Sequence, residues 1–280
     1  MDRSMITAAV SMGQLQKGMD VISNNISNLN TTGFKGRNVS FSSLLVQSMN
    51  EQPDKNQDLG RLSPLGVRFG SGSRVAATQI DPSQGSIEKT DRALDFALGK
   101  PNQFFTIQVN DDGGAETRYT RNGAFYLQED AQNANLMNLV TADGSFVLNN
   151  QGNRIQVPAQ FKDIKVSNTG AITAQRPGTL DTVNVGQLGV VSIKHPQLLE
   201  SMGDSAFTLP DLNALGLTRA DVFDQLNADD RSVQQGALEA SNVDLTDQMT
   251  QLTNLQRSYQ FDARAISISD DMMNLINSMR

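Results

Sequence analysis

The side chains that could carry out chemistry in this sequence are few and scattered. His195 is the single histidine and there is no cysteine, which argues against a zinc site and excludes a cysteine nucleophile. Residues 111–114, DDGG, lack the alternating carboxylates of a calcium loop and predict a turn. Residues 70–73, GSGS, lack the spacing of a hydrolase elbow and a phosphate-binding lysine, and predict a hinge. With no acid–base pair at a defensible spacing, we expect no enzyme activity, no metal and no cofactor.

Composition also limits the classes of molecule that the protein is expected to bind. The 280 residues carry a net charge of −7, whereas nucleic acids and anionic membranes attract clustered Lys and Arg. No run approaches the ~20 apolar residues that span a bilayer. The N-terminus also lacks the apolar core and cleavage site of a secretory signal peptide. We therefore expect no nucleic-acid binding and no membrane insertion, and export, if it occurs, by a route without a cleaved signal.

In the N-terminal segment the apolar residues recur with the period of a helix. Two apolar rows each recur every seven residues, offset by three, and the other faces are polar. Such a pattern predicts a helix with a seam for another helix. The rows are Met5, Met12, Met19 and Ile26, and Ala8, Leu15, Ile22 and Leu29.

The C-terminal segment repeats the pattern. Its heptad row is broadened by further apolar residues, Ser241 or Asn242 can cap its start, and Asp244 and Asp247 complement the helix dipole. A helix over residues 243–280 would extend for about 55 Å at the standard rise. The apolar residues are Leu245, Met249, Leu252, Leu255, Tyr259, Ala263, Ile266, Met273 and Ile276.

Between the ends the period changes to two. Short alternating segments such as residues 104–109 and 117–120 are separated by Gly- and Asn-rich turns, which predicts antiparallel strands. The predicted class is α+β: paired N- and C-terminal amphipathic helices, an extended connector and an antiparallel β-rich middle domain. The predicted boundaries are an N-terminal helix in 1–34, the connector in 35–75, the β-rich outer domain in 76–234 and the C-terminal helix in 235–280.

The two helical ends lack enough apolar surface nearby to bury their stripes. We expect them to pack on each other and on further copies, because a contact that repeats without closing builds a helical filament. The open alternative is a monomeric bundle in which the methionine row is ordinary core.

Two segments, residues 22–35, ISNNISNLNTTGFK, and residues 236–244, GALEASNVD, lie at the inner ends of the two predicted helices. They resemble the N-terminal signature of the bacterial flagellar rod and hook proteins and the lead of that family into its C-terminal helix. Residues 256–260, QRSYQ, resemble an element within that helix. Residues 81–85 and 119–125 are similar to the distal-rod-like branch, close to hook-basal-body proteins of Gram-positive bacilli. The signature residues are Asn24, Asn25, Asn28, Thr32, Gly33, Phe34, Ser241, Asn242, Gln256 and Arg257.

The resemblance implies a structural subunit of the flagellar basal-body rod, outside the cytoplasmic membrane. Its terminal helices would form a tube that surrounds the export channel and transmits torque from motor to hook. The implied partners are copies of itself, neighbouring rod and hook subunits, the flagellar type III export apparatus and, in passing, peptidoglycan. Residues 41–45, FSSLL, are similar to the family's export motif through Phe41 and Leu45; the alternative is that these side chains only pack a strand or short helix.

Two other classes remain as alternatives. A secreted adhesin would need a polar groove rich in exposed aromatic residues, and the chain has no Trp and only three Tyr. An enzyme would need a nucleophile and a base in one constellation, which the sequence does not offer.

Overall fold

The computed structural model describes residues 2–43, 46–49, 67–70, 73–111, 114–130, 132–161, 163–176, 182–203, 205–212, 214, 216–224, 226 and 230–279. The chain divides into two compact units. The first comprises residues 1–26, 37–79 and 244–280, and the second residues 27–36 and 80–243. The two ends of the chain thus share one unit, while the middle forms the other.

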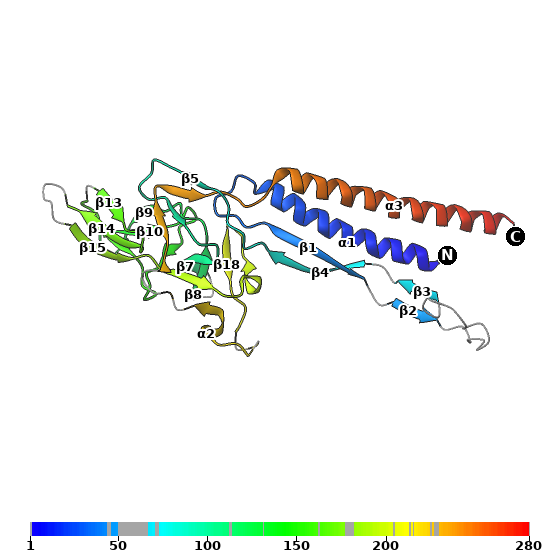
Figure 1. Ribbon diagram of the computed structural model, residues 1–280, viewed down its shortest axis with the longest axis horizontal. Helices are drawn as coiled ribbons and strands as arrows, with labels where there is room; N and C mark the ends of the chain where they lie inside the picture. Colours follow the sequence, from blue (N-terminus) through cyan, green and yellow to red (C-terminus); the bar gives the residue numbers. More distant parts are fainter. Residues whose placement is uncertain are drawn as a thin grey trace, which may run out of the picture. The chain divides into compact units, whose positions relative to one another are not determined.

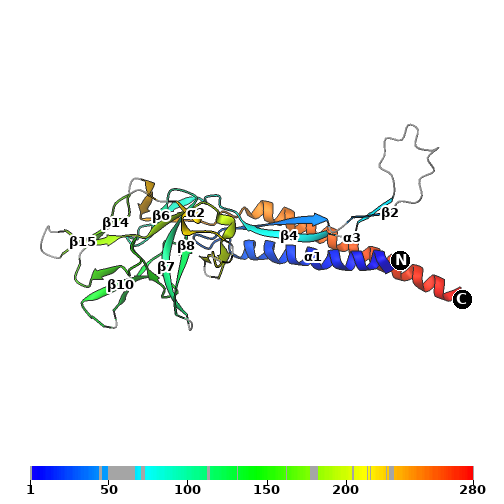
Figure 2. The same ribbon diagram turned by 90° about the horizontal axis from the view of Figure 1, so that it is seen from below.

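The first unit holds the two long helices and a β-ribbon. Helix α1 spans Asp2–Ser27 and α3 spans Leu245–Ser278, and they lie side by side in opposite directions (Figures 1 and 2). Strand β1 (Arg37–Ser43) pairs with β4 (Ser73–Ile80), and β2 (Val46–Met49) pairs antiparallel with β3 (Val67–Gly70). Much of the described part of the predicted connector is therefore paired strand.

Helix α3 starts slightly later than predicted. Its N-cap is Asp244, whose carboxylate accepts from the backbone N–H groups of Thr246 at 2.7 Å and Asp247 at 3.3 Å. The prediction that Ser241 or Asn242 caps the helix is wrong. The Asn242 amide is used elsewhere: it accepts from the Gly36 N–H and donates to backbone carbonyls of residues 81 and 83.

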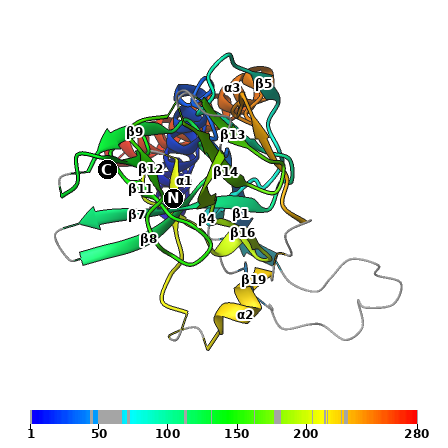
Figure 3. The same ribbon diagram turned by 90° about the vertical axis from the view of Figure 1, so that its left-hand side faces the viewer.

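The second unit is mainly antiparallel sheet, so the α+β class and the β-rich middle are confirmed. Its largest sheet contains ten of the described strands, and β7 and β8 form a long hairpin within it (Figure 3). A three-stranded sheet has the order β13-β14-β15, and two strand pairs, β20 with β6 and β21 with β5, complete the unit. The elements of this unit are β5 (Ile87–Lys89), β6 (Phe96–Leu98), β7 (Gln103–Asp111), β8 (Gly114–Thr120), β9 (Tyr126–Glu129), β10 (Leu136–Val140), β11 (Phe146–Val147), β12 (Gln156–Pro158), β13 (Asp163–Val166), β14 (Ala171–Gln175), β15 (Thr182–Gln187), β16 (Val190–Ile193), the 3₁₀ turn η1 (Pro196–Leu198), β17 (Glu200–Ser201), β18 (Ala206–Thr208), α2 (Arg219–Val222), β19 (Phe223–Asp224), β20 (Val233–Gln235) and β21 (Ala237–Glu239).

Strand β7 separates two hydrophobic clusters because successive side chains of a strand point to opposite faces. Phe105 and Ile107 belong to the larger cluster, which also contains Phe125 and Leu188. Phe104 belongs to the smaller one, with Tyr119, Ile193, Leu199, Phe207 and Val222. The aromatic rings meet edge to face, with centroids 5.2 Å apart for Phe105–Phe125 and 5.9 Å for Phe104–Phe207. The sheet is thus buried on both faces around its central strand.

Candidate functional site

On α1, the predicted seam coincides with the face that the rest of its unit covers. Ala8, Leu15 and Ile22 are buried and stand one heptad apart. Leu29 lies beyond the helix, in the turn that follows. The other predicted row is half-buried; it consists of Met5, Met12, Met19 and Ile26.

On α3, the predicted seam divides into two groups. One group is half-buried and lies on the same helix face as the buried residues Gln248 and Ser269, because these residues follow one another in steps of three or four. It consists of Leu252, Leu255, Tyr259, Ala263, Ile266 and Met273. The other group, Leu245, Met249 and Ile276, is exposed. A single chain therefore covers one stripe of each helix and leaves part of the predicted seam uncovered.

A buried amide ties the helices together where α1 ends and α3 begins. The Asn25 side chain is buried; its Nδ2 donates to Gln248 Oε1 at 2.9 Å and to the Arg37 carbonyl at 2.9 Å. Its Oδ1 accepts from the Arg37 N–H at 3.0 Å. Because these bonds engage both ends of the amide, Asn25 fixes the register of α1 against both α3 and β1.

Phe41, the first residue of the predicted export motif, packs inside the helical unit. Its ring lies over Gly18 of α1, so close that a Cβ at Gly18 would stand 2.9 Å from Phe41 Cζ and 3.1 Å from Leu255 Cδ1. The ring is nevertheless 39% exposed. Leu45 lies outside the described residues, and the export role of the motif stays a prediction.

A second apolar row on α3 was missed from the sequence. Phe261, Ile268 and Leu275 recur every seven residues and are 67%, 57% and 63% exposed; Met272 and Met279 extend the same face. We call these five residues the outer stripe. Ile268 and Met272 each directly precede a residue of the covered face of α3, Ser269 and Met273, and the other three share their heptad positions. Because successive residues differ by about 100° around a helix, the outer stripe lies about 100° away from that covered face. Its heptad spacing was the signal that could have revealed it.

In the second unit, three charged side chains form a buried cluster that we call the junction cluster: Lys35, Arg121 and Glu239. Glu239 Oε1 accepts from Lys35 Nζ at 2.7 Å and from the Gly85 N–H at 3.0 Å. Glu239 Oε2 lies 2.5 Å from Arg121 Nη2. Lys35 also donates to the Ser83 carbonyl. One carboxylate thus holds together the segment after α1, the loop at residues 81–85 and the segment before α3.

The charges of the junction cluster are strongly desolvated. Burial is the main cause that lowers the pKa of Lys35, and the Arg121 charge lowers it further, while Glu239 acts in the opposite direction. Burial likewise lowers the pKa of Arg121 against the raising effect of Glu239. Arg121 Nη1 donates to the carbonyls of Lys100 and Gln103. Two cations share one anion, so Glu239 is the residue on which the cluster depends.

Around this cluster, signature residues shape the backbone. Gly33 has a φ of +67° and its N–H donates to the Glu239 carbonyl at 2.7 Å, while a Cβ there would collide with the backbone of Asn122. Thr32 Oγ1 donates to Asn122 Oδ1 at 3.1 Å. Asn242 links the Gly36 N–H to the loop at residues 81–85. These contacts lie within one unit and join segments that are between 90 and 206 residues apart in sequence.

The remaining signature residues are spread out. Asn28 Oδ1 accepts from Thr31 Oγ1, and Ser241 Oγ accepts from the Val243 N–H. Phe34 is half-buried. Three residues are exposed on the helices: Asn24, Gln256 and Arg257.

Sequence reasoning did not single out Lys35, Arg121 or Glu239, although each lies in a quoted segment. Their charges read as surface residues because nothing local indicates burial. In the part of the chain that the structure describes, no group of three or more His, Asp or Glu could hold a metal ion. Nor is any described helix long and apolar enough to cross a bilayer. The junction cluster holds segments that are distant in sequence in place.

Comparison with known proteins gives matches over most of the chain. Residues 5–35 match the family described as flagella basal body rod protein. Residues 101–174 match the flagellar hook protein FlgE/F/G D1 domain, and residues 234–279 the flagellar basal body rod FlgEFG protein C-terminal family.

Full-length relatives agree with these matches. The flagellar hook-basal body complex protein FlhP of Bacillus subtilis is 40% identical, and the alignment covers 99% of each chain. The flagellar basal-body rod protein FlgG of Agrobacterium fabrum is 31% identical over 98% of each chain, and FlgG of Bacillus subtilis is 31% identical over 99% of each. The chain therefore belongs to the flagellar basal-body rod and hook family, as the sequence segments indicated.

Proposed function

We propose that this structural protein of the flagellar basal body polymerises through its terminal helices, and that the outer stripe of α3 is the surface that receives the next copy. The chain resides in the flagellar basal body as a rod subunit, by its family. The resulting helical tube would surround an export channel and transmit torque from motor to hook. The observation that carries the proposal is the outer stripe.

The outer stripe supports this role through its area and spacing. Phe261, Ile268 and Leu275 recur every seven residues without a gap. Such regular apolar spacing is typical of a face that packs against another helix. Burying each such side chain contributes about 1.5–3 kcal/mol. Three or more of them from every copy supply several kcal/mol per contact before the cost of association is subtracted. Helices α1 and α3 of one chain would thus pack on each other first, and the outer stripe would then bind the helix pair of the next chain.

Three finer parts of the proposal rest on the family and the sequence. Phe41 would serve export recognition before folding and then pack on Gly18 afterwards. The β-rich unit would face outward and meet peptidoglycan in passing, and neighbouring rod and hook subunits would continue the axis. The proposed functional division keeps the predicted boundaries, with 1–34 and 235–280 as the inner helical domain, 35–75 as connector and 76–234 as outer domain.

The test is a double substitution on the outer stripe, Phe261→Ser with Leu275→Ser, in the full chain. We expect the isolated variant to retain its helical circular dichroism, because neither side chain is covered within the chain. Polymer formation, followed by sedimentation and electron microscopy, should fall sharply. A deletion strain that carries the variant should not swim.

The matched control is Gln260→Ser, an exposed position next to Phe261 on the same helix. It should assemble and support swimming as the unaltered chain does. Normal polymers and normal swimming from the double variant would contradict the proposal.

A further inference from the structure

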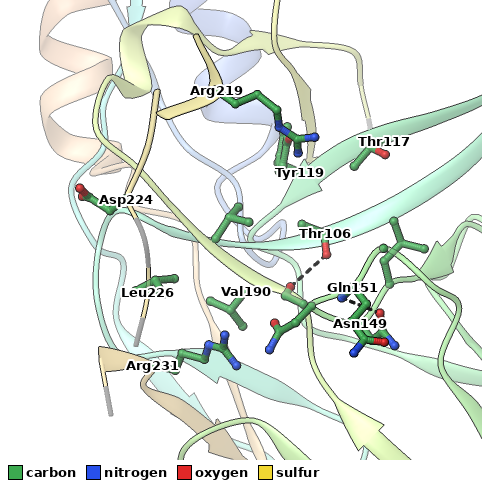
Figure 4. Close-up of a pocket in the computed structure, with 15 residues that line it drawn as sticks. Thr106, Thr117, Tyr119, Asn149, Gln151, Val190, Arg219, Asp224, Leu226 and Arg231 are labelled. Atoms are coloured by element: carbon green, nitrogen blue, oxygen red, sulfur yellow. Dashed lines mark hydrogen bonds between the residues drawn. The ribbon is translucent and has the colours of Figure 1, made fainter. Parts of the chain in front are cut away.

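The β-rich unit contains a pocket that is not lined by any residue of the junction cluster. It has a volume of about 420 Å³ and is formed by residues of β7, β8 and β16, the loop at residues 148–152, and the side chains of Arg219, Asp224, Leu226 and Arg231 (Figure 4). Small-molecule sites commonly measure about 300–1,000 Å³. The pocket is therefore large enough for a ligand of a few rings or a short polyol.

Two arginines enter the pocket from opposite sides, as Figure 4 shows for Arg219 and Arg231. Among the described residues, neither guanidinium has a carboxylate within 4.0 Å. The one acidic lining residue, Asp224, pairs instead with Lys194 at 3.5 Å. Two arginines without a carboxylate partner in the described structure therefore line one pocket of a chain whose net charge is −7. They give the pocket a local excess of positive charge.

One nitrogen of the Arg231 guanidinium lacks a hydrogen-bond partner among the described residues. Its Nε is buried and makes no hydrogen bond within the described structure. Burial lowers the pKa of Arg231. The Asn150 amide, turned so that its oxygen faces the guanidinium, accepts from Nη2 at 2.8 Å and donates to the Leu188 carbonyl at 3.0 Å. Arg231 lines the pocket without a carboxylate partner among the described residues, and an anionic ligand would supply the missing negative charge.

Arg219 is held in a different way. Its guanidinium carbon stands 5.5 Å from the centre of the Phe223 ring, and the Tyr119 hydroxyl lies in hydrogen-bond reach of the same guanidinium. Stacking on one face leaves the planar edge of the guanidinium for an acceptor.

The neutral polar residues of the pocket favour hydroxyl groups on the ligand. Asn149 Oδ1 already accepts from the N–H groups of Gln151 at 2.8 Å and Asn153 at 2.9 Å, which leaves its amide nitrogen as a donor. Thr106 Oγ1 donates to the Gly189 carbonyl at 3.2 Å (Figure 4), whereas Thr117 and Gln151 line the pocket with further polar groups. Amides and hydroxyls of this kind bind hydroxyls in either hydrogen-bonding direction.

We propose that this pocket binds an anionic carbohydrate: a sugar or polyol that carries a carboxylate or a phosphate. The anion lies at Arg231, and the hydroxyl groups lie toward Asn149, Gln151 and Thr117. Arg219 contacts a second acceptor at the other end. This site is independent of the polymerisation role, since none of its residues belongs to the terminal helices α1 and α3 or to the junction cluster.

The experiment is a titration of the full chain with isotope-labelled Leu and Val methyl groups. Leu148, Val190, Val191 and Leu226 line the pocket and report occupancy directly. The probes are a glucuronic-acid disaccharide, glycerol 1-phosphate and, as the neutral control, cellobiose. We expect saturable shifts confined to these methyl groups with at least one of the two anionic probes, weakened by added salt. Which of the two binds tells whether a carboxylate or a phosphate is the natural anion.

Variants separate this site from unspecific attraction. Arg231→Gln should weaken the binding of the anionic probe at least tenfold, with the methyl signals outside the pocket unchanged as the sign of an intact fold. Arg154→Gln is the matched control, because Arg154 is exposed and its guanidinium stands 4.0 Å from the Phe146 ring, outside the pocket. It should bind as the unaltered chain does. The proposal is overturned if neither anionic probe shifts the four methyl groups, if cellobiose shifts them equally, or if Arg231→Gln binds unchanged.

Discussion

Glu239→Gln is the substitution that most directly tests the junction cluster. Gln has the same shape and keeps an oxygen that can accept from Lys35 or Gly85, but it removes the only negative charge in the cluster. Its NH₂ group would then face a donor, either Lys35 Nζ or Arg121 Nη2, which now stand 2.7 and 2.5 Å from the carboxylate oxygens. Glu239 is 2% exposed, so water cannot take over its role. Removing one partner of a buried ion pair costs about 3–5 kcal/mol.

Against a typical total of about 5–15 kcal/mol, that loss is a large fraction of the stability of the β-rich unit. The assay is urea unfolding followed by tyrosine fluorescence in a Tyr259→Phe background. In that background the remaining tyrosines, Tyr119 and Tyr126, both report on the β-rich unit. The signal from α3 is thereby removed, and the transition belongs to one cooperative unit.

The matched control is Glu88→Gln, the same chemical change at an exposed position of β5, the strand that pairs with β21. It should change the unfolding free energy by no more than about 0.5 kcal/mol. A loss below about 1 kcal/mol for Glu239→Gln would refute the reasoning, since it would mean that the two cations are stable without their anion.

The remaining predictions concern the helices and the pH dependence. Gly13→Ala should raise the thermal stability of the helical signal by about 0.5–1 kcal/mol, because a Cβ there meets nothing within 4 Å. Gly18→Ala should lower it, because the added Cβ must displace Phe41 and Leu255, and overpacking costs about 1–3 kcal/mol; a rise in both variants would contradict this packing. The lowered pKa of Lys35 means that the folded state loses this proton before the unfolded state does. Stability should therefore rise with pH between that lowered pKa and 10.5, and urea titrations of Lys35→Met should lack this rise.

Much of the architecture could be predicted because its signals are local. The seven-residue spacing of Ala8, Leu15 and Ile22 indicates a helix face, and these residues are buried on α1. The alternation in residues 104–109 indicates a strand, and it forms the centre of the largest sheet as β7. Periods of 3.6 and 2 need no knowledge of distant residues.

Other features depend on residues far apart in sequence. Strands such as β6 and β21 have three residues each, and their partners β20 and β5 lie between 135 and 152 residues away, so no local period reveals them. The burial of Lys35 and Glu239 follows from a contact across 204 residues. Asn242 reads as a helix cap because Asn is a good cap, yet its amide is engaged by the loop at residues 81–85. The outer stripe is different: its spacing was visible, but the broader first row obscured it.

The central claim, that sister subunits cover the outer stripe, is tested most directly by thiol labelling. The chain has no cysteine, so Ile268→Cys introduces a single reactive group on that face, and Glu129→Cys places one on the exposed edge of β9 as a control. In dilute monomer both thiols should react quickly with maleimide. In assembled polymer the thiol at position 268 should react at least about tenfold more slowly, while that at position 129 remains reactive. Equal labelling of position 268 in monomer and polymer would contradict the account.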